Sequence, residues 1–184
     1  RLRGELSRVA VEQAVGAGPV VVDEGAPRRL DHAHALGRAG EGLGHGADVA
    51  GGEERVVHGL HDESLGYNFL GLFLLDPATG DRVLHASVGW AGVPKAMRVA
   101  PGQGLSDRAL VEQRLCYTAD VTRAAGYLPS LNSGSEVDIP LLIEGRPIGV
   151  LVVESDAPDA FSRDDFEILT AAATQASIAI ARAR

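Results

Sequence analysis

A hairpin of two apolar strands, predicted from residues 135–155, constrains the fold of this chain more than any other feature. In its first strand Val137, Ile139, Leu141 and Ile143 occupy alternate positions, which is the pattern of a strand that buries one face. A tight turn at 144–146 follows, and the second strand is apolar on both of its faces. We therefore expect the second strand to be central in its sheet.

The rest of the chain after residue 64 predicts further elements of an α+β fold. Strands are expected at 65–75, 82–89, 95–99 and 115–119, with a turn at 76–81 that has proline early and glycine late. In the second of these strands, Leu84 and Ala86 are expected to share one face. A helix is expected at 107–113 with Ser106 as its N-cap, and a short helical turn at 122–127. Antiparallel hairpins, an inserted helical segment and a long flanking helix indicate a sandwich of helix on sheet.

The last helix is expected to run from Arg163 to Ala183, because Ser162 followed by Asp165 three residues later is a variant of the capping box. A second stripe of the helix, at 168, 172 and 179, is also apolar. Since one stripe can pack on the sheet and leave the other for a partner helix, we expect a homodimer, and a weak one because alanines bury little area. The predicted dimer seam has heptad spacing and consists of Phe166, Leu169, Ala173, Ala176 and Ile180.

The first 64 residues differ in composition from the remainder. They contain no Phe, Tyr, Trp, Ile, Met, Cys, Lys, Asn or Thr, and they carry every histidine except His85. Two interpretations stay open. The segment is either disordered and of low complexity, or it results from off-frame translation of a GC-rich gene, which would produce this amino-acid composition. We expect the boundary to divide the chain into 1–51 and 52–184, and we assign no function to the histidines of the first part.

Composition excludes several classes of partner. The net charge of −8 argues against a nucleic-acid partner, because binding nucleic acid needs a basic patch. The sequence also lacks the long run of Lys and Arg that would bind an anionic membrane surface. The longest apolar run is too short to insert into a membrane. A single cysteine excludes an internal disulfide and fits a reducing compartment. With no visible signal peptide, we expect a cytoplasmic protein.

Three blocks of the sequence are similar, in order and spacing, to GAF domains over about 56–184. They read LGYNFLGLFLLDPATGDRVLHASVGW, GQGLSDRALVEQRLCYTADVTRAAGYLP and SEVDIPLLIEGRPIGVLVVESDAPDAFSRDDFEILTAAATQASIAIARAR. The resemblance implies a PAS-related antiparallel sheet of five to six strands, with helices on its faces and a long C-terminal helix. It also implies a sensory or regulatory domain of a bacterial signalling protein, such as a two-component system, with an effector domain after the last helix.

The resemblance places a small-molecule site between the sheet and the inserted helical segment, and it implies no cofactor, no metal and no catalysis. Aromatic side chains would form the walls of the site, and carboxylates would accept hydrogen bonds from an amine or a purine edge. The residues expected there are Trp90, Tyr117, Asp120, Tyr127, Asn132, Ser135 and Glu136.

Two other functions remain as alternatives. In the first, side chains fill the cavity and the domain is a ligand-free dimerisation module. In the second, the chain is a thiol redox enzyme of the same fold, similar to free methionine sulfoxide reductases. Those enzymes use several cysteines, whereas this sequence has only Cys116, which we expect to be a small buried hydrophobe.

Overall fold

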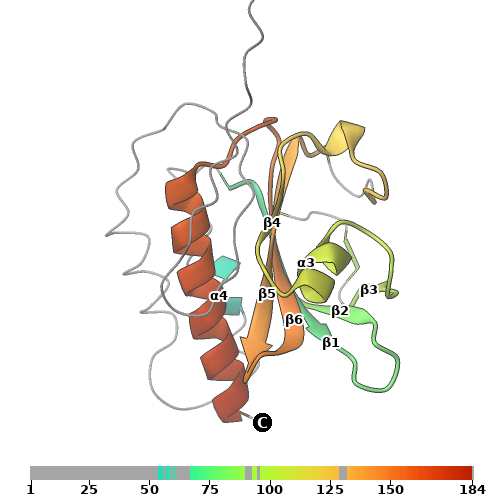
Figure 1. Cartoon of the computed structure of the whole chain (residues 1–184), viewed down its shortest axis with the longest axis vertical. Helices are drawn as coiled ribbons and strands as arrows, with labels where there is room; N and C mark the ends of the chain where they lie inside the picture. Colours follow the sequence, from blue (N-terminus) through green and yellow to red (C-terminus); the bar gives the residue numbers. More distant parts are fainter. Residues whose placement is uncertain are drawn as a thin grey trace, which may run out of the picture.

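The computed structural model describes residues 54–55, 57–58, 60, 67–89, 93–94, 96–128 and 132–183. A six-stranded antiparallel sheet forms the centre of this part of the chain (Figure 1). The spatial order of the strands is β3-β2-β1-β6-β5-β4. The two most apolar strands, β1 and β6, are therefore central, as the sequence predicted for β6. The strands are β1 (Phe69–Leu75), β2 (Arg82–Val88), β3 (Arg98–Val99), β4 (Cys116–Thr118), β5 (Ser135–Ile143) and β6 (Arg146–Ser155).

The predicted hairpin is present as β5 and β6, which pair from Ser135 and Ser155 down to Ile143 and Arg146. Its two-residue turn consists of Glu144 and Gly145, with φ values of 49° and 72°. Two consecutive left-handed residues match the right-handed twist of the flanking strands, which is why such turns dominate short hairpins.

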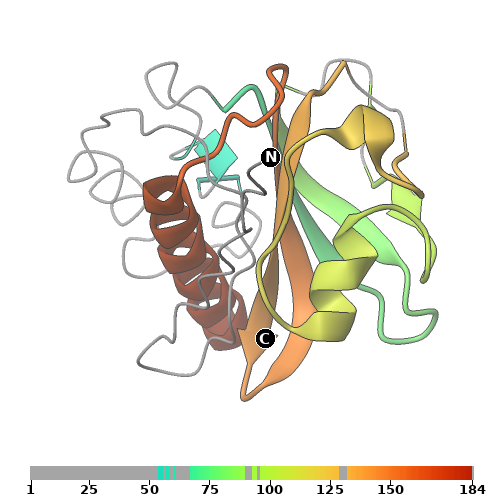
Figure 2. The ribbon, with the colours of Figure 1, turned by 45° about the horizontal axis from the view of Figure 1, so that its top comes forward.

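Two helices cover opposite faces of this sheet, as both overall views show (Figures 1 and 2). Helix α4 (Arg163–Ala183) lies against β5 and β6 on one face, and α3 (Ser106–Glu112) lies against the same strands on the other. A short 3-10 helix, η1 (Val121–Arg123), replaces the predicted turn at 122–127. The expected α+β sandwich is therefore confirmed.

Each face of the sheet carries its own apolar cluster. The larger cluster joins Val137, Ile139 and Leu141 of β5 to α4, and it also includes Val57 and Leu60. The smaller cluster contains Phe73 and Leu84 on the α3 face. Alternation along β5 therefore sends its aliphatic side chains to the α4 face, as predicted.

A register shift between Leu72 and Phe73 changes which face of the sheet the side chains of β2 point to. Leu72 pairs with Ala86, but Phe73 pairs with Leu84, so β2 has one additional residue at this point. Leu84 and Ala86 consequently lie in different apolar clusters. The prediction that they share a face was wrong because a bulge inserts one residue and reverses the alternation.

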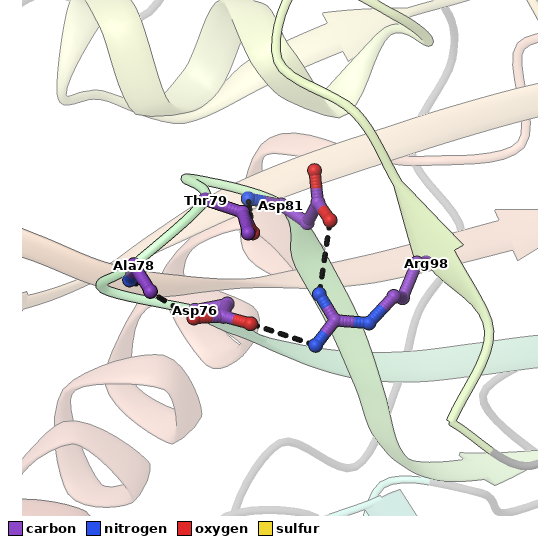
Figure 3. Close-up of polar contacts among 5 residues, drawn as sticks. All are labelled: Asp76, Ala78, Thr79, Asp81 and Arg98. Atoms are coloured by element: carbon purple, nitrogen blue, oxygen red, sulfur yellow. Dashed lines mark hydrogen bonds and ion pairs between the residues drawn. The ribbon is translucent and has the colours of Figure 1, made fainter.

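The short strand β3 is held at the edge of the sheet by Arg98, as Figure 3 shows. Its guanidinium contacts Asp76 Oδ2 at 2.7 Å and Asp81 Oδ2 at 2.9 Å, and it therefore bridges both ends of the β1–β2 turn. Asp76 also accepts a hydrogen bond from the backbone N–H of Ala78, which is the usual role of Asp in a turn. The exposed ion pairs fix the shape of the turn and contribute little stability.

Helix α4 begins with the predicted capping box. The backbone N–H of Ser162 donates to Asp165 Oδ2 at 2.7 Å, and the backbone N–H of Asp165 donates back to Ser162 Oγ at 3.3 Å. The prediction for α3 was wrong: its N-cap is Leu105, without a side-chain cap. Ser106 instead accepts a hydrogen bond from Arg82, which pulls it toward β2.

The predicted dimer seam of α4 is buried inside this chain. Because heptad spacing marks an apolar stripe but not what covers it, assigning this stripe to a partner helix was wrong. The exposed face of α4 instead carries Glu167, Thr174 and Ile178. The five seam residues pack in the larger apolar cluster with the sheet: Phe166, Leu169, Ala173, Ala176 and Ile180.

A buried carboxyl cluster as candidate functional site

Three carboxyl side chains are buried on the α3 face of the sheet, and they form what we call the carboxyl cluster: Glu136 and Asp138 of β5 and Glu154 of β6. Their exposed fractions are 5%, 1% and 3%. Glu136 pairs directly with Glu154 across the two strands, so both side chains leave the sheet on the same side. Asp138 lies two residues from Glu136, and therefore on the same face.

Hydrogen bonds join two members of the cluster to each other and the third to the β4–β5 connection. Glu136 and Asp138 are bonded to each other through their side chains, which requires one proton between the two carboxyls. Glu154 Oε2 accepts hydrogen bonds from Ser133 Oγ and, at 3.5 Å, from the hydroxyl of Tyr127. Among the described residues, Asp138 Oδ1 has no hydrogen-bond partner.

All three carboxyls are harder to ionise than usual. Burial raises the pKa of Glu136 well above its ordinary value, and the charges of Asp138 and Glu154 raise it further. Burial also raises the pKa of Asp138 to about 8, although the hydrogen bond with Glu136 opposes the shift. Burial raises the pKa of Glu154 too, against the opposing hydrogen bonds from Ser133 and Tyr127. The cluster therefore holds protons near neutral pH.

Arg82 of β2 is the buried cation beside the cluster, but its hydrogen bonds are made elsewhere. Nη1 donates to Ser106 Oγ at 2.6 Å, and Nη2 donates to the carbonyls of Ala100, at 3.0 Å, and Gln103. Asp107 lies 3.8 Å away. Burial lowers the pKa of Arg82, while the charges of Asp107, Asp138 and Glu136 raise it, in that order. Arg82 thus holds the loop before α3 and only weakly compensates the carboxyls.

The structure brings two of the residues predicted from sequence to this cluster. Glu136 is a member, and Tyr127 contacts Glu154. Ser135 is buried, but its hydroxyl bonds to the backbone of Ala157 and Ala160 in the β6–α4 loop.

The other predicted residues lie elsewhere. Tyr117 points to the α4 face, where its ring packs against Phe166 with centroids 5.1 Å apart. Asp120 caps η1, Asn132 is exposed, and Trp90 lies outside the described residues.

Sequence reasoning missed Asp138, Glu154, Ser133 and Arg82. A signal was present, because Glu136 and Asp138 occupy alternate positions in a strand whose other face is aliphatic from residue 137 onward. Such a strand is expected to expose its polar face to water. Only the packing of α3 and the β4–β5 connection shows that this face is buried.

Cys116 is a buried neighbour of the cluster and pairs with Asp138 across β4 and β5. Burial is the largest influence on its thiol and raises its pKa. Its side chain packs in the smaller apolar cluster beside Leu110, which confirms the prediction of a small buried hydrophobe. A neutral thiol of this kind is a poor nucleophile.

Two kinds of feature are absent from the described residues. They contain no group of three or more His, Cys, Asp and Glu side chains arranged to hold a metal ion. Within the same part of the chain, no helix combines the length and the apolar character that crossing a membrane requires.

Comparison with known proteins places the chain in a family. Its residues 53–181 match the GAF domain. A curated relative, GAF domain-containing protein A of Dictyostelium discoideum, is 29% identical over 59% of this chain and 66% of its own length. The chain thus spans just under two thirds of that relative.

Solved structures of two kinds resemble this fold. The GAF domain of a phosphoenolpyruvate-protein phosphotransferase from Coxiella burnetii has a TM-score of 0.76, with 22% identity over 84% of this chain and 95% of that one. A type II free methionine-R-sulfoxide reductase from Thermoplasma acidophilum has a TM-score of 0.63, with 25% identity over 70% of this chain and 89% of that one. The family match covers most of the chain and agrees with the sheet order and flanking helices, and the protein therefore belongs to the GAF domain family.

Proposed function

We propose that this chain is a sensory or regulatory GAF domain of a cytoplasmic signalling protein, which binds a small molecule at the carboxyl cluster and controls an attached effector. The observation that carries the proposal is the carboxyl cluster itself. Burying ionisable groups without full compensation costs stability, and perturbed carboxyls concentrate at functional sites. The face that holds them is the one that α3 covers, where a GAF domain is expected to receive its ligand.

The short strand β4 offers a route from the cluster to α4. Cys116 and Thr118 pair with Asp138 and Glu136 and so lie on the cluster's face of the sheet, while Tyr117 between them lies on the other face. The Tyr117 hydroxyl donates to Asp159 Oδ1 at 2.9 Å, just before α4 begins. A ligand that moves β4 therefore also moves the start of α4, and it favours one packing of the helix over another.

Thermal unfolding of the full chain against cyclic nucleotides, amino acids, nitrate, haem and a bilin tests the proposal. A compound that binds the folded state raises the unfolding temperature in proportion to the logarithm of its concentration once the site is saturated. The rise should disappear in Glu136→Gln and persist in Asp81→Asn, a matched change in the distant β1–β2 turn. No shift with any compound, on a cooperatively unfolding protein, contradicts the proposal.

The alternative is that the domain binds no ligand and serves as a dimerisation module. The exposure of Ile178 supports this alternative. This large apolar side chain of α4 is 41% exposed, and it lies on the face of α4 away from the buried seam. Pairing through this face would be abolished by Ile178→Glu without loss of folding. Such a result together with a flat ligand panel would favour the module over the sensor.

The similarity to reductase structures supports a second alternative, free methionine-R-sulfoxide reduction. The single, buried Cys116 argues against it, because a sulfenic acid formed there has no second thiol in this sequence to resolve it. Dithiothreitol can itself reduce such a sulfenic acid, so the assay tests attack by Cys116 on the sulfoxide. Because burial raises the pKa of this thiol and keeps it neutral, we expect the full chain with dithiothreitol and methionine-R-sulfoxide to show no turnover above a heat-denatured control. Turnover that Cys116→Ser removes would establish the enzyme instead.

A further inference from the structure

The charges that face the carboxyl cluster leave it with an excess of acid. Among the described residues, the titratable groups around it are Arg82 of β2, Cys116 of β4 and Tyr127 of the β4–β5 connection. On α3, Arg108 and Glu112 pair with each other at 2.8 Å, beside the thiol. Arg82 directs both terminal nitrogens to the loop before α3. Of the cations in the described residues, Arg82 therefore lies near the cluster, and none is recorded as hydrogen-bonded to it.

Within the part of the chain that the structure describes, the same region has more hydrogen-bond acceptors than donors. Six carboxyl oxygens belong to three acidic side chains. The donors recorded for them are the hydroxyls of Ser133 and Tyr127, both to Glu154 Oε2, and the one proton between Glu136 and Asp138. Asp138 Oδ1, on a side chain that is 1% exposed, accepts a hydrogen bond from no described residue. A group that brings several donors and a positive charge would complete the cluster.

We propose that the ligand of this domain carries a protonated primary amine, and that the ammonium group takes the place of the proton shared by Glu136 and Asp138, with Glu154 as a further acceptor. The inference rests on the proposed function, since it names the ligand class of that same site. An ammonium has three donors and one charge, and charge-assisted bonds to carboxylates are stronger than neutral ones. The displaced proton goes to solvent.

Proton displacement gives the binding a distinct dependence on pH. When one proton leaves for each ligand bound, the affinity rises about tenfold per pH unit below the pKa of the group that loses it. Burial raises the pKa of both Glu136 and Asp138, so affinity should rise with pH through the neutral range until these carboxyls ionise in the free protein. A neutral amide or purine edge would bind without releasing a proton, and its affinity would not change in this way.

Two matched series of compounds test the charge requirement on the full chain: phenethylamine, phenethyl alcohol and hydrocinnamate, and butylamine, butanol and butyrate. Calorimetry at constant ionic strength, in phosphate buffer, compares the three members of each series. We expect at least one amine to bind at least about tenfold more tightly than its alcohol, with the carboxylate weakest. Phenol red in lightly buffered solution should record close to one proton released per amine bound.

Variants locate the effect. Asp138→Asn keeps the shape of the side chain but cannot ionise, so we expect about a tenfold or greater loss of amine affinity and no proton release. Asp81→Asn should leave both unchanged, and far-UV circular dichroism checks that each variant is folded. Amines that bind no better than alcohols, bind without releasing a proton, or bind Asp138→Asn equally well overturn the inference. The thermal-unfolding panel then separates the two proposals. If a neutral or anionic compound raises the unfolding temperature, and Glu136→Gln abolishes that rise, the proposed function holds and only the amine inference fails. If no compound raises the unfolding temperature, both proposals fail.

Discussion

The hydroxyl of Tyr67, just before β1, donates a buried hydrogen bond of 2.7 Å to Oδ1 of Asp165, 98 residues further along the chain. The other oxygen of Asp165 accepts from Ser162 in the capping box of α4. One carboxylate therefore caps the long helix and also ties its first turn to the start of the central strand. Burial, followed by the charge of Asp165, raises the pKa of Tyr67, so the hydroxyl keeps its proton.

Removing that hydroxyl should destabilise the domain. Tyr67→Phe leaves one oxygen of a buried carboxylate without its donor, and we expect a loss of about 1–3 kcal/mol in the free energy of unfolding. Tyr117→Phe is the matched control, because its bond to Asp159 is exposed, and it should cost less than about 1 kcal/mol. Urea unfolding of both variants measures the difference. Equal losses would show that the Asp165 bond has no special role.

Stability should fall as pH rises toward 8, in contrast to a domain held by salt bridges. The folded state raises the pKa of Asp138 to about 8, whereas an unfolded Asp titrates near ~3.9. Between these values the folded state binds more protons than the unfolded state, so the free energy of unfolding decreases with pH. The raised pKa of Glu136 acts in the same direction.

Asp138→Asn should remove the Asp138 part of this pH dependence. We expect the variant and the natural chain to differ little at pH 4, and the variant to gain stability relative to the natural chain as pH rises to 8, by ~1.4 kcal/mol for each pKa unit involved. Thermal unfolding at several pH values is the measurement. An unchanged slope in the variant would show that Asp138 is not the group that titrates.

Two isoleucines of α4 should respond differently to the same substitution. Ile180 is buried against the sheet, so Ile180→Glu buries an unpaired carboxylate and should cost at least about 3 kcal/mol. Ile178 is largely exposed, and Ile178→Glu should change stability by less than about 0.5 kcal/mol. Denaturant unfolding gives both values, and light scattering gives the mass of each variant in solution. A loss of less than about 1 kcal/mol in Ile180→Glu would contradict the packing of α4 described above.

Arg82 should be required for the loop between β3 and α3. Arg82→Met retains much of the apolar stem but removes the donors to Ser106, Ala100 and Gln103. Leaving a buried acceptor without its donor costs about 1–3 kcal/mol, so we expect a loss of at least that order in the free energy of unfolding. Hydrogen exchange should show faster exchange at 100–107. Arg98→Met, at the exposed β1–β2 turn, should leave that region unchanged, and unaltered exchange in Arg82→Met would contradict the assigned role.

Elements with local signals could be predicted from the residue pattern alone. The glycine turn and alternating aliphatics specify the β5–β6 hairpin, and Ser162 with Asp165 specifies the first residue of α4. These features depend on residues a few positions apart, so a pattern in the chain is enough to find them.

The contacts of each face, in contrast, depend on packing between elements that lie far apart in the chain. The stripe from Phe166 to Ile180 packs on the sheet of its own chain, and a bulge sends Leu84 and Ala86 to opposite faces. Glu136, Asp138 and Glu154 come together because β5 pairs with β6 and other segments cover that face. Periodicity fixes how side chains relate within one element, but burial and charge coupling arise between elements, where the sequence has no local signal.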